Sequence, residues 1–446
     1  MARGIGGLMS FRFLHTGDLH LDSPFVGLTA EAPAGVAETL REATLQSWQG
    51  IVQLALDEKV DFMLVAGDVF EHANRTLRGQ VRFRDGLADL ARAGIPSFVV
   101  TGNHDPLSGW EPSVTWPELV YRFPARIVTG VPVIREGEEI ARVYGVSFHV
   151  RDVTTNLASH FRREAGVRFA VGLLHTNVGA IAGEDNCAPC TLQDLRAADM
   201  DYWALGHIHR HAILAAGRPT VVYCGNPQGR DPGESDACGC YLVTVDDAGA
   251  IHPEFRPVDV VRWQLLDIPI AGMPDEESLI ERVAGAADAA RSVAERAIVA
   301  RITLRGRGAL HTSLQRPGVL ADVRTMAQER LGETLPFAWV ESVRDETRGE
   351  LDLVNRRLAD DFLGDLLRRF EQARVSLRNS ADPGATRDTA APPDPIVAQI
   401  EESIDLLYCH ERARRYLRDV RPSEARLAEL LDEAESMVAD RLGGDA

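Results

Sequence analysis

Residues that commonly bind divalent metals follow apolar segments of this sequence, each near the point where its segment ends. The set comprises two aspartates, four histidines and an asparagine, together with a histidine and an aspartate that directly follow the asparagine. They are Asp18, His20, Asp68, Asn103, His104, Asp105, His175, His207 and His209. Imidazole and carboxylate together suit Mn, Fe or Zn better than Mg or Ca. Two such ions can hold a bridging hydroxide and clamp a phosphate for in-line attack, so the residue types predict phosphoester hydrolysis.

Strands are expected to position these residues. Apolar runs predict them at residues 11–18, 61–68, 95–101, 169–175 and 201–206. Apolar residues at three- and four-residue steps predict intervening helices at residues 36–59 and 76–93. A strand delivers its C-terminal residue to one edge of the sheet, where ligands bind in open α/β sheets. Five strand ends would therefore bring the polar set together.

The next segments suggest a second sheet. Short strands with little helix between them are expected in residues 126–148, a helix near 192–198, and hairpin strands at 219–224 and 239–245. The pattern indicates an α/β fold in which two sheets pack face to face with helices outside them.

The 446-residue length suggests about three domains. We predict a first domain at residues 1–257 and a small α/β cap domain at 258–348, with helices at 276–294 and 317–331 and strands at 297–304 and 337–344. A helical region would occupy residues 349–446, interrupted by a Pro- and Ala-rich linker at about 379–395 that has little to bury. Apolar stripes that begin at residues 351 and 396, on either side of this linker, could pack on each other or on a partner.

A single histidine at a strand end is usually just a hydrogen-bonded polar residue. Five motifs in a fixed order, each after a predicted buried strand, carry far more information, because structural context is what makes a motif specific. The order D-x-H, G-D, G-N-H-D, H, G-H-x-H over residues 11–255 resembles the calcineurin-like metallophosphoesterase superfamily. Residues 18–25, 201–209 and 225–230 are similar to the YhaO branch of the SbcD-type DNA repair exonucleases.

This resemblance implies a four-layer α-β-β-α sandwich with a cap domain and C-terminal helices. It also implies two divalent ions, usually Mn²⁺. One ion would be held by Asp18, His20 and His209, the other by Asn103, His175 and His207, and Asp68 would bridge them. His104 would protonate or steady the leaving oxygen, and Asp105 would orient His104.

The resemblance further implies DNA as substrate and an SMC-like ATPase that contacts the C-terminal helices. Homodimer formation stays open. One departure is Glu71, which stands where archaeal and eukaryotic relatives carry a second active-site histidine; it leaves the balance of exonuclease and endonuclease activity open. The following His72 is expected to be a loop residue.

Two rival functions share this evidence. The first is a phosphatase or small-molecule phosphodiesterase on the same metal core. Protein phosphatases of the superfamily place Asp-Arg-Gly soon after the bridging aspartate, whereas this chain has VFEHA at residues 69–73. The second is a non-enzymatic scaffold. A complete set of buried polar ligands argues against it, because burying such groups is costly.

Charge adds a weaker constraint. A net charge of −18 argues against a nucleic-acid binder that uses its whole surface. A local cationic site remains compatible with it, especially one built around metal ions. Arg230 could hold a substrate phosphate or form a surface salt bridge. The arginine-rich residues 412–421 could be a solvated helix face or touch DNA phosphates.

Other sequence features concern zinc and location. Four cysteines have spacings compatible with zinc, although buried or loop thiols are the simpler interpretation: Cys187, Cys190, Cys238 and Cys240. No run approaches the roughly 18 apolar residues of a transmembrane helix. The first ten residues contain no apolar signal-peptide region, so we expect no membrane association and a cytoplasmic protein.

Overall fold

The computed structural model describes residues 10–29, 31–71, 76–108, 114–179, 181, 185–350, 353–381, 402 and 424–443. The chain divides into two compact units. The first comprises Met1–Ile268, Glu277–Thr303 and Leu320–Arg344, and the second comprises Pro269–Glu276, Leu304–Val319 and Asp345–Ala446.

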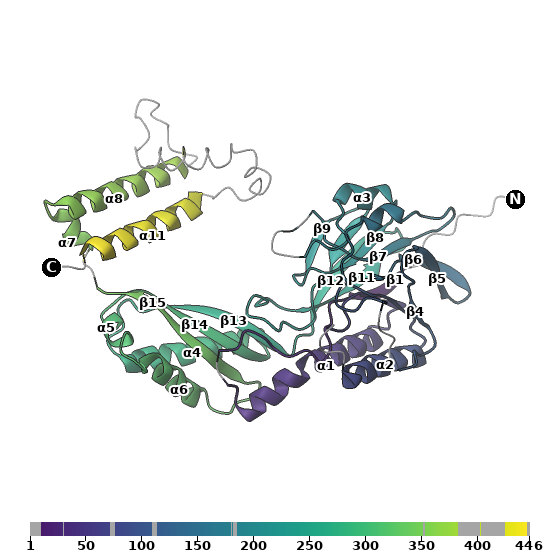
Figure 1. Cartoon of the computed structure of the whole chain (residues 1–446), viewed down its shortest axis with the longest axis horizontal. Helices are drawn as coiled ribbons and strands as arrows, with labels where there is room; N and C mark the ends of the chain where they lie inside the picture. The colour runs from purple at the N-terminus through teal and green to yellow at the C-terminus, as the bar shows by residue number, and fades with distance from the viewer. Residues whose placement is uncertain are drawn as a thin grey trace. The chain divides into compact units, whose positions relative to one another are not determined.

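Two six-stranded sheets form the larger part of the first unit (Figure 1). One sheet has the order β12-β11-β1-β2-β3-β4, with β1 (Phe11–Thr16), β2 (Phe62–Ala66), β3 (Ser97–Val100), β4 (Val120–Arg122), β11 (Gly239–Val245) and β12 (Ile251–Pro257). The other has the order β5-β6-β7-β8-β10-β9, with β5 (Thr129–Arg135), β6 (Glu138–Gly145), β7 (Ala170–His175), β8 (Tyr202–Gly206), β9 (Ala212–Ala215) and β10 (Thr220–Tyr223). Strands β1 to β4 run parallel to one another, as do β6, β7, β8 and β10.

The sheets pack face to face. Alternate residues of each strand point to opposite faces of its sheet, so one set lies between the sheets and the other set faces outward. Phe13 of β1 and Phe62 of β2 pack in the core between the sheets with Tyr202 of β8. Leu14 and Met63, their neighbours in sequence, pack instead in the cluster that contains residues of the helices α1 (Ala34–Asp57) and α2 (Leu77–Arg92).

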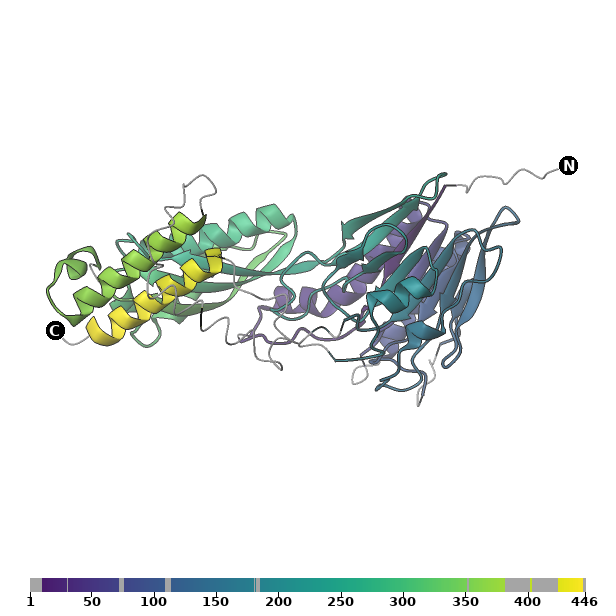
Figure 2. The same ribbon diagram turned by 90° about the horizontal axis from the view of Figure 1, so that it is seen from above.

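The outer face of the second sheet is covered in the same way. Trp203 of β8 packs there with Leu195 of α3 (Leu192–Ala197) and Ala158 of the 3-10 helix η2 (Leu157–His160). Figure 1 shows α1 and α2 on one side of the sheets and α3 on the other, and Figure 2 shows the sheets from above. The predicted four-layer α-β-β-α fold is confirmed.

The two strands that we expected to be hairpin strands lie in different sheets. Strand β10 pairs antiparallel with β9 and parallel with β8, whereas β11 pairs antiparallel with β1 and β12. Strand β10 forms a hairpin with β9, and β11 forms a hairpin with β12.

The cap sheet has three strands, in the order β13 (Val261–Pro269), β14 (Ala297–Arg307) and β15 (Ala338–Arg348). Helices α4 (Glu276–Ala294), α5 (His311–Leu314) and α6 (Val319–Leu331) accompany it. Strand β13 and helix α5 were not predicted. Both β14 and β15 contribute residues to both compact units, and the predicted domain boundaries at residues 257 and 348 stay predictions.

Within the first compact unit, buried residues of the cap sheet pack against helix α1. Leu40 of α1 packs in one cluster with Trp263, Val299 and Trp339 of the cap sheet. Beside this cluster, the Arg301 guanidinium donates hydrogen bonds to Glu341 and to the Gly27 carbonyl.

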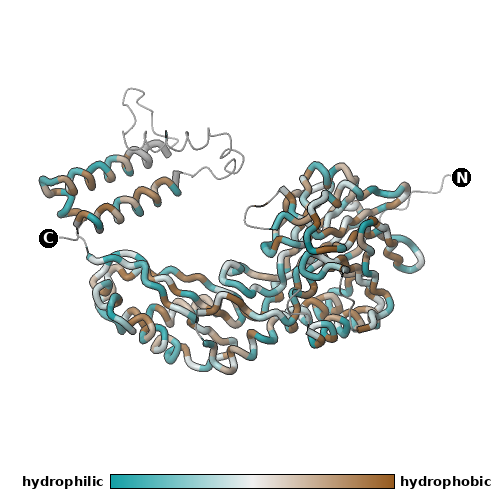
Figure 3. The backbone as a smooth tube through the Cα atoms, viewed as in Figure 1, coloured by the Kyte–Doolittle hydropathy of each residue, from teal (hydrophilic) through white to brown (hydrophobic). Residues whose placement is uncertain are grey.

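Three helices from the described part of the C-terminal region belong to the second unit: α7 (Leu353–Leu358), α8 (Phe362–Ala381) and α11 (Glu424–Gly443). Polar and apolar residues alternate along α8 and α11 in Figure 3, and the apolar faces pack on each other through Phe370, Ala373 and Leu431. The stripe predicted from residue 351 is broken between α7 and α8. As a result, Leu358 and Phe362 are 78% and 73% exposed.

Some predictions lie outside the described residues. These are His72, most of the linker at 379–395, the apolar stripe from residue 396 and the arginine-rich residues 412–421. Within the described part of the chain, no helix is long and apolar enough to cross a membrane.

Candidate metal centre

The predicted site residues all lie at or just beyond the carboxyl ends of parallel strands. Asp18 and His20 follow β1, and Asp68 follows β2. Residues 103–105 follow β3, His175 ends β7, and His207 and His209 follow β8. The backbone departs from ordinary conformations at four of these positions, with φ of 49° at Asp18, 42° at His20, 49° at Asp68 and 102° at His207. Such conformations are costly and cluster at functional sites.

Small residues allow the two sheets to approach at this edge. A Cβ atom added to Gly102 would lie 2.2 Å from Asp68 Oδ1 and 2.7 Å from His175 Nε2. One added to Gly206 would lie 2.2 Å from the Ala66 carbonyl oxygen. Glycine at position 102 therefore leaves room for the polar side chains, and glycine at position 206 leaves room for the backbone of β2.

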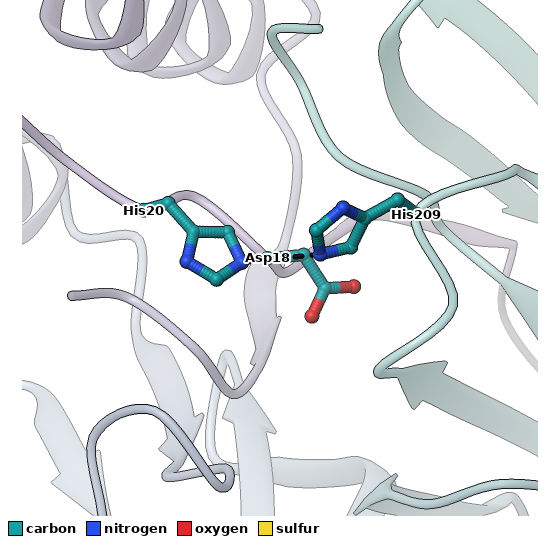
Figure 4. Close-up of side chains that lie close together, drawn as sticks. All are labelled: Asp18, His20 and His209. Atoms are coloured by element: carbon teal, nitrogen blue, oxygen red, sulfur yellow. Dashed lines mark hydrogen bonds between the residues drawn. The ribbon is translucent and has the colours of Figure 1, made fainter. Parts of the chain in front are cut away.

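One group of potential ligands consists of Asp18, His20 and His209, which each offer a ligand atom within 4.8 Å of the others. Figure 4 shows the rings of His20 and His209 side by side, next to the Asp18 carboxylate. Their Nε2 atoms are 3.1 Å apart. Two imidazole nitrogens that bind one ion at about 2.1 Å and at right angles lie about 3 Å apart, so the pair fits a shared ion.

A second group consists of Asp18, Asp68 and His175. His175 Nδ1 lies 2.9 Å from the Ala66 carbonyl oxygen, to which it can donate. The ring's Nε2 lies 2.8 Å from Asn103 Oδ1 and 3.3 Å from Asp68 Oδ2. With Nδ1 donating, Nε2 among these oxygens must carry a proton or bind a cation. The donor set therefore fits a metal ion.

Asp18 is the residue that these two groups share. Its oxygens accept hydrogen bonds from the His207 backbone N–H at 3.0 and 3.1 Å. Asp68 Oδ1 accepts from the His104 backbone N–H at 2.9 Å. The bridging role expected for Asp68 stays a prediction.

His207 is close to the second group without belonging to it. Its ring centre is 5.1 Å from that of His175. Its Nε2 is 2.7 Å from the Asp185 carbonyl oxygen and can donate to it, so Nδ1 is the nitrogen left to bind an ion.

Electrostatics at the centre favour a positive charge. Burial raises the pKa of Asp18 to about 6. Burial works in the same direction on Asp68, but the charges of His175 and His20 outweigh it and hold the pKa of Asp68 far below its usual value. Although burial opposes it, the two carboxylates raise the pKa of His175 to about 9. In the metal-free protein a proton on His175 thus supplies the charge that an ion would supply.

Two carboxylates whose supporting role was not predicted contact the histidines. Glu71 Oε1 lies 2.6 Å from His104 Nδ1, and Glu234 Oε1 lies 2.5 Å from His209 Nδ1. Asp105, expected to orient His104, accepts backbone hydrogen bonds from Gly102 and Val69 at 2.7 and 2.8 Å, and its expected role stays a prediction. The position of Glu71 relative to Asp68 was the only sequence signal; nothing in the spacing pointed to Glu234.

Arg230 lies beside this centre. Its charge helps to lower the pKa of His20 to about 3, although burial is the larger cause. Its backbone N–H donates to Glu234 Oε2 at 2.6 Å. Among the residues that the structure describes, none forms an ion pair with the Arg230 side chain, which leaves the phosphate-binding alternative in place.

The cysteines take no part in the groups of potential metal ligands found among the described residues. Cys187, Cys190, Cys238 and Cys240 are buried and free, and burial raises the pKa of each thiol. These properties agree with the simpler interpretation of the four cysteines as buried thiols.

Comparison with known proteins identifies the family of the chain. The sequence model of the calcineurin-like phosphoesterase family matches residues 11–211, and that of the middle domain of metallophosphoesterase YhaO matches residues 263–348. Together with a relative that is 35% identical over most of both chains, these matches show that the chain belongs to the calcineurin-like metallophosphoesterase family. That relative is YhaO of Bacillus subtilis, an uncharacterised metallophosphoesterase; the 371 aligned residues cover 83% of this chain and 89% of YhaO.

Two more distant relatives carry nuclease or repair names. The SbcD component of the nuclease SbcCD of Escherichia coli is 26% identical over 304 residues, which cover 58% of this chain and 72% of that protein. The DNA double-strand break repair protein Mre11 of Thermoplasma acidophilum is 26% identical over 231 residues, 49% of this chain and 58% of Mre11.

Proposed function

We propose that the protein is a nuclease that hydrolyses DNA phosphodiester bonds with two divalent ions, Mn²⁺ being the expected metal. Two groups of potential ligands that share Asp18 carry the proposal, since together they offer donor atoms for two adjacent ions. Similarity to a component of a nuclease and to a DNA repair protein supports DNA as the substrate class.

The proposed roles are those expected from the sequence. Asp18, His20 and His209 hold one ion, Asn103, His175 and His207 hold the other, and Asp68 bridges them. Bound divalent ions supply Lewis-acid polarisation of the phosphate and activation of water. His104 protonates or steadies the leaving oxygen.

Arg230 is the proposed anchor for a substrate phosphate outside the metal ligands. Its charge reaches both His20 and His209, and its side chain is only partly buried. The guanidinium fork matches the oxygens of a phosphate in geometry and charge. Arg230→Ala should therefore raise KM for DNA more than it lowers kcat.

The proposed partner is an SMC-like ATPase, as the resemblance to SbcD-type nucleases implies. An apolar helix face laid on a partner's helices is a common recognition mode. Leu358 of α7 and Phe362 of α8 offer exposed apolar surface for such a contact.

The deciding experiment measures cleavage of labelled single- and double-stranded DNA with Mn²⁺, with EDTA as control. Asp68→Ala should abolish cleavage, whereas Asp322→Ala, at an exposed position of α6, should not. A phosphatase would prefer a phosphomonoester, and a small-molecule phosphodiesterase would hydrolyse dinucleotides but not polymeric DNA. A scaffold would show no metal-dependent turnover, so each rival predicts a different result.

A further inference from the structure

We propose that Glu71 is a positioning residue for His104: its carboxylate fixes the imidazole so that Nε2 delivers the proton to the leaving oxygen. The inference rests on the proposed phosphodiester hydrolysis.

The geometry sets Glu71 between two histidines. Its Oε1 lies 2.6 Å from His104 Nδ1, and its Oε2 lies 3.2 Å from His20 Nδ1. The His20 and His104 rings meet edge to face, with centroids 5.1 Å apart. The side chains of Glu71 and His104 are 23% and 26% exposed, whereas that of His20 is 1% exposed. Glu71 and His104 therefore lie at the mouth of the centre, where a substrate can reach.

The backbone before Glu71 is held in place. The Val69 N–H donates to Asp105 Oδ2 at 2.8 Å, and the Val69 carbonyl accepts from the Leu21 N–H at 2.9 Å. The Asp68 carbonyl accepts from the His20 N–H at 3.1 Å. The segment that carries Glu71 is thus tied to the loops after β1 and β3.

Glu71 is a carboxylate that contacts the His104 ring directly. Both carboxylate oxygens of Asp105 accept backbone hydrogen bonds, which tie the loops after β2 and β3 together. A carboxylate that accepts from one ring N–H fixes both the tautomer and the orientation of an imidazole. With Nδ1–H given to Glu71, proton transfer must use Nε2.

The chemical step is balanced without another reactant. Water forms the new P–O bond, and the bond to the leaving group breaks with its electron pair on the leaving oxygen. That oxygen takes the Nε2 proton of protonated His104, and a proton from the attacking water restores the protonated ring. Proton donation by His104 matters most when the leaving oxygen is strongly basic.

The test uses the full-length chain loaded with Mn²⁺ and a series of aryl phosphodiesters, from nitrophenyl to unsubstituted phenyl. For Glu71→Ala we expect kcat on the phenyl ester to fall roughly 10–100-fold, the usual effect of losing such a support. The loss on the nitrophenyl ester should be much smaller, because nitrophenolate needs little protonation. Glu71→Gln should restore part of the activity, because its amide oxygen can still accept from Nδ1–H.

Three further variants and one metal analysis complete the test. His104→Ala should show the same leaving-group dependence, and the double variant Glu71→Ala/His104→Ala should be no slower than His104→Ala. Glu118→Ala, an exposed glutamate outside the centre, should match the wild type. Metal content, by elemental analysis, should not change in Glu71→Ala.

If Glu71→Ala lost activity equally on all esters, or lost bound metal, Glu71 would serve His20 and the proposal would be overturned. Wild-type rates in Glu71→Ala would overturn it as well. Failure of the proposed DNA activity is separate. It would appear as a wild type that hydrolyses aryl diesters but not DNA, and the Glu71 comparison would still stand. A wild type inactive on every diester would overturn both.

Discussion

Glu234 contacts His209 with one carboxylate oxygen and the Arg230 backbone with the other. The first contact joins Oε1 to His209 Nδ1 at 2.5 Å, and the second joins Oε2 to the Arg230 N–H at 2.6 Å. Burial would raise the pKa of Glu234, but the hydrogen bond and charge of His209 lower it to about 2. Glu234 is therefore ionised at neutral pH and keeps His209 Nε2 directed at the proposed ion.

Glu234→Gln is expected to weaken metal binding by about 10–100-fold, the usual effect of removing a carboxylate behind a ligating histidine. Titration of the metal-free protein with Mn²⁺ by calorimetry measures this directly. Glu254→Gln, at an exposed site on β12, is the matched control. Unchanged affinity in Glu234→Gln would argue that His209 is not a ligand.

Asp68→Ala is expected to abolish activity while the fold is kept. The side chain contacts His175 and the His104 backbone, so its loss disturbs the second ligand group and the loop after β3. Circular dichroism should be unchanged. Activity equal to that of the wild type would rule out the dinuclear site.

His104→Ala separates catalysis from metal binding. We expect two bound ions per chain by elemental analysis, together with a turnover that is lower by about 10²–10⁴-fold on esters with basic leaving groups. Loss of both ions would make His104 a structural part of the metal centre instead.

Metal affinity should rise with pH up to about 9. A histidine binds an ion only when neutral, and the neighbouring carboxylates raise the pKa of His175 to about 9 against the effect of burial. Below that pH the ion must displace a proton from His175. Calorimetry at pH 7.5, in two buffers with different ionisation enthalpies, should reveal net proton release. A metal affinity that is constant from pH 6.5 to 8.5 would contradict this linkage.

The exposed apolar residues of the C-terminal helices provide a test of the proposed partner. Leu358→Asp with Phe362→Asp should abolish co-purification with an SMC-like ATPase and leave hydrolysis of aryl diesters intact. Val293→Asp, at an 86% exposed site on α4, is the control for a charge added elsewhere. Retained binding by the double variant would place the contact on another surface.

The sequence could predict which side chains come together, because the candidate ligands lie where buried strands end. An apolar run fixes the strand, and the strand fixes where the next polar residue appears. Glu234 escaped prediction because it lies in a loop 25 residues after His209, where folding and not local pattern decides its neighbours. The sequence did not show that β10 and β11 lie in different sheets, for the same reason. A period-two pattern identifies a strand but not the strands that pair with it.

The four positive φ angles at Asp18, His20, Asp68 and His207 carry a consequence for evolution and engineering. Each such conformation costs on the order of 1–3 kcal/mol in a non-glycine residue, somewhat less for aspartate. Replacing Asp68 with glycine would relieve this backbone cost, but it would also remove the carboxylate that pairs with protonated His175 in the metal-free protein. The melting temperature of that variant should therefore rise by less than the backbone cost alone would give. In a lineage that lost the need for hydrolysis, the backbone cost would favour glycine or asparagine at these positions, and the ion pairs of the centre would oppose the change.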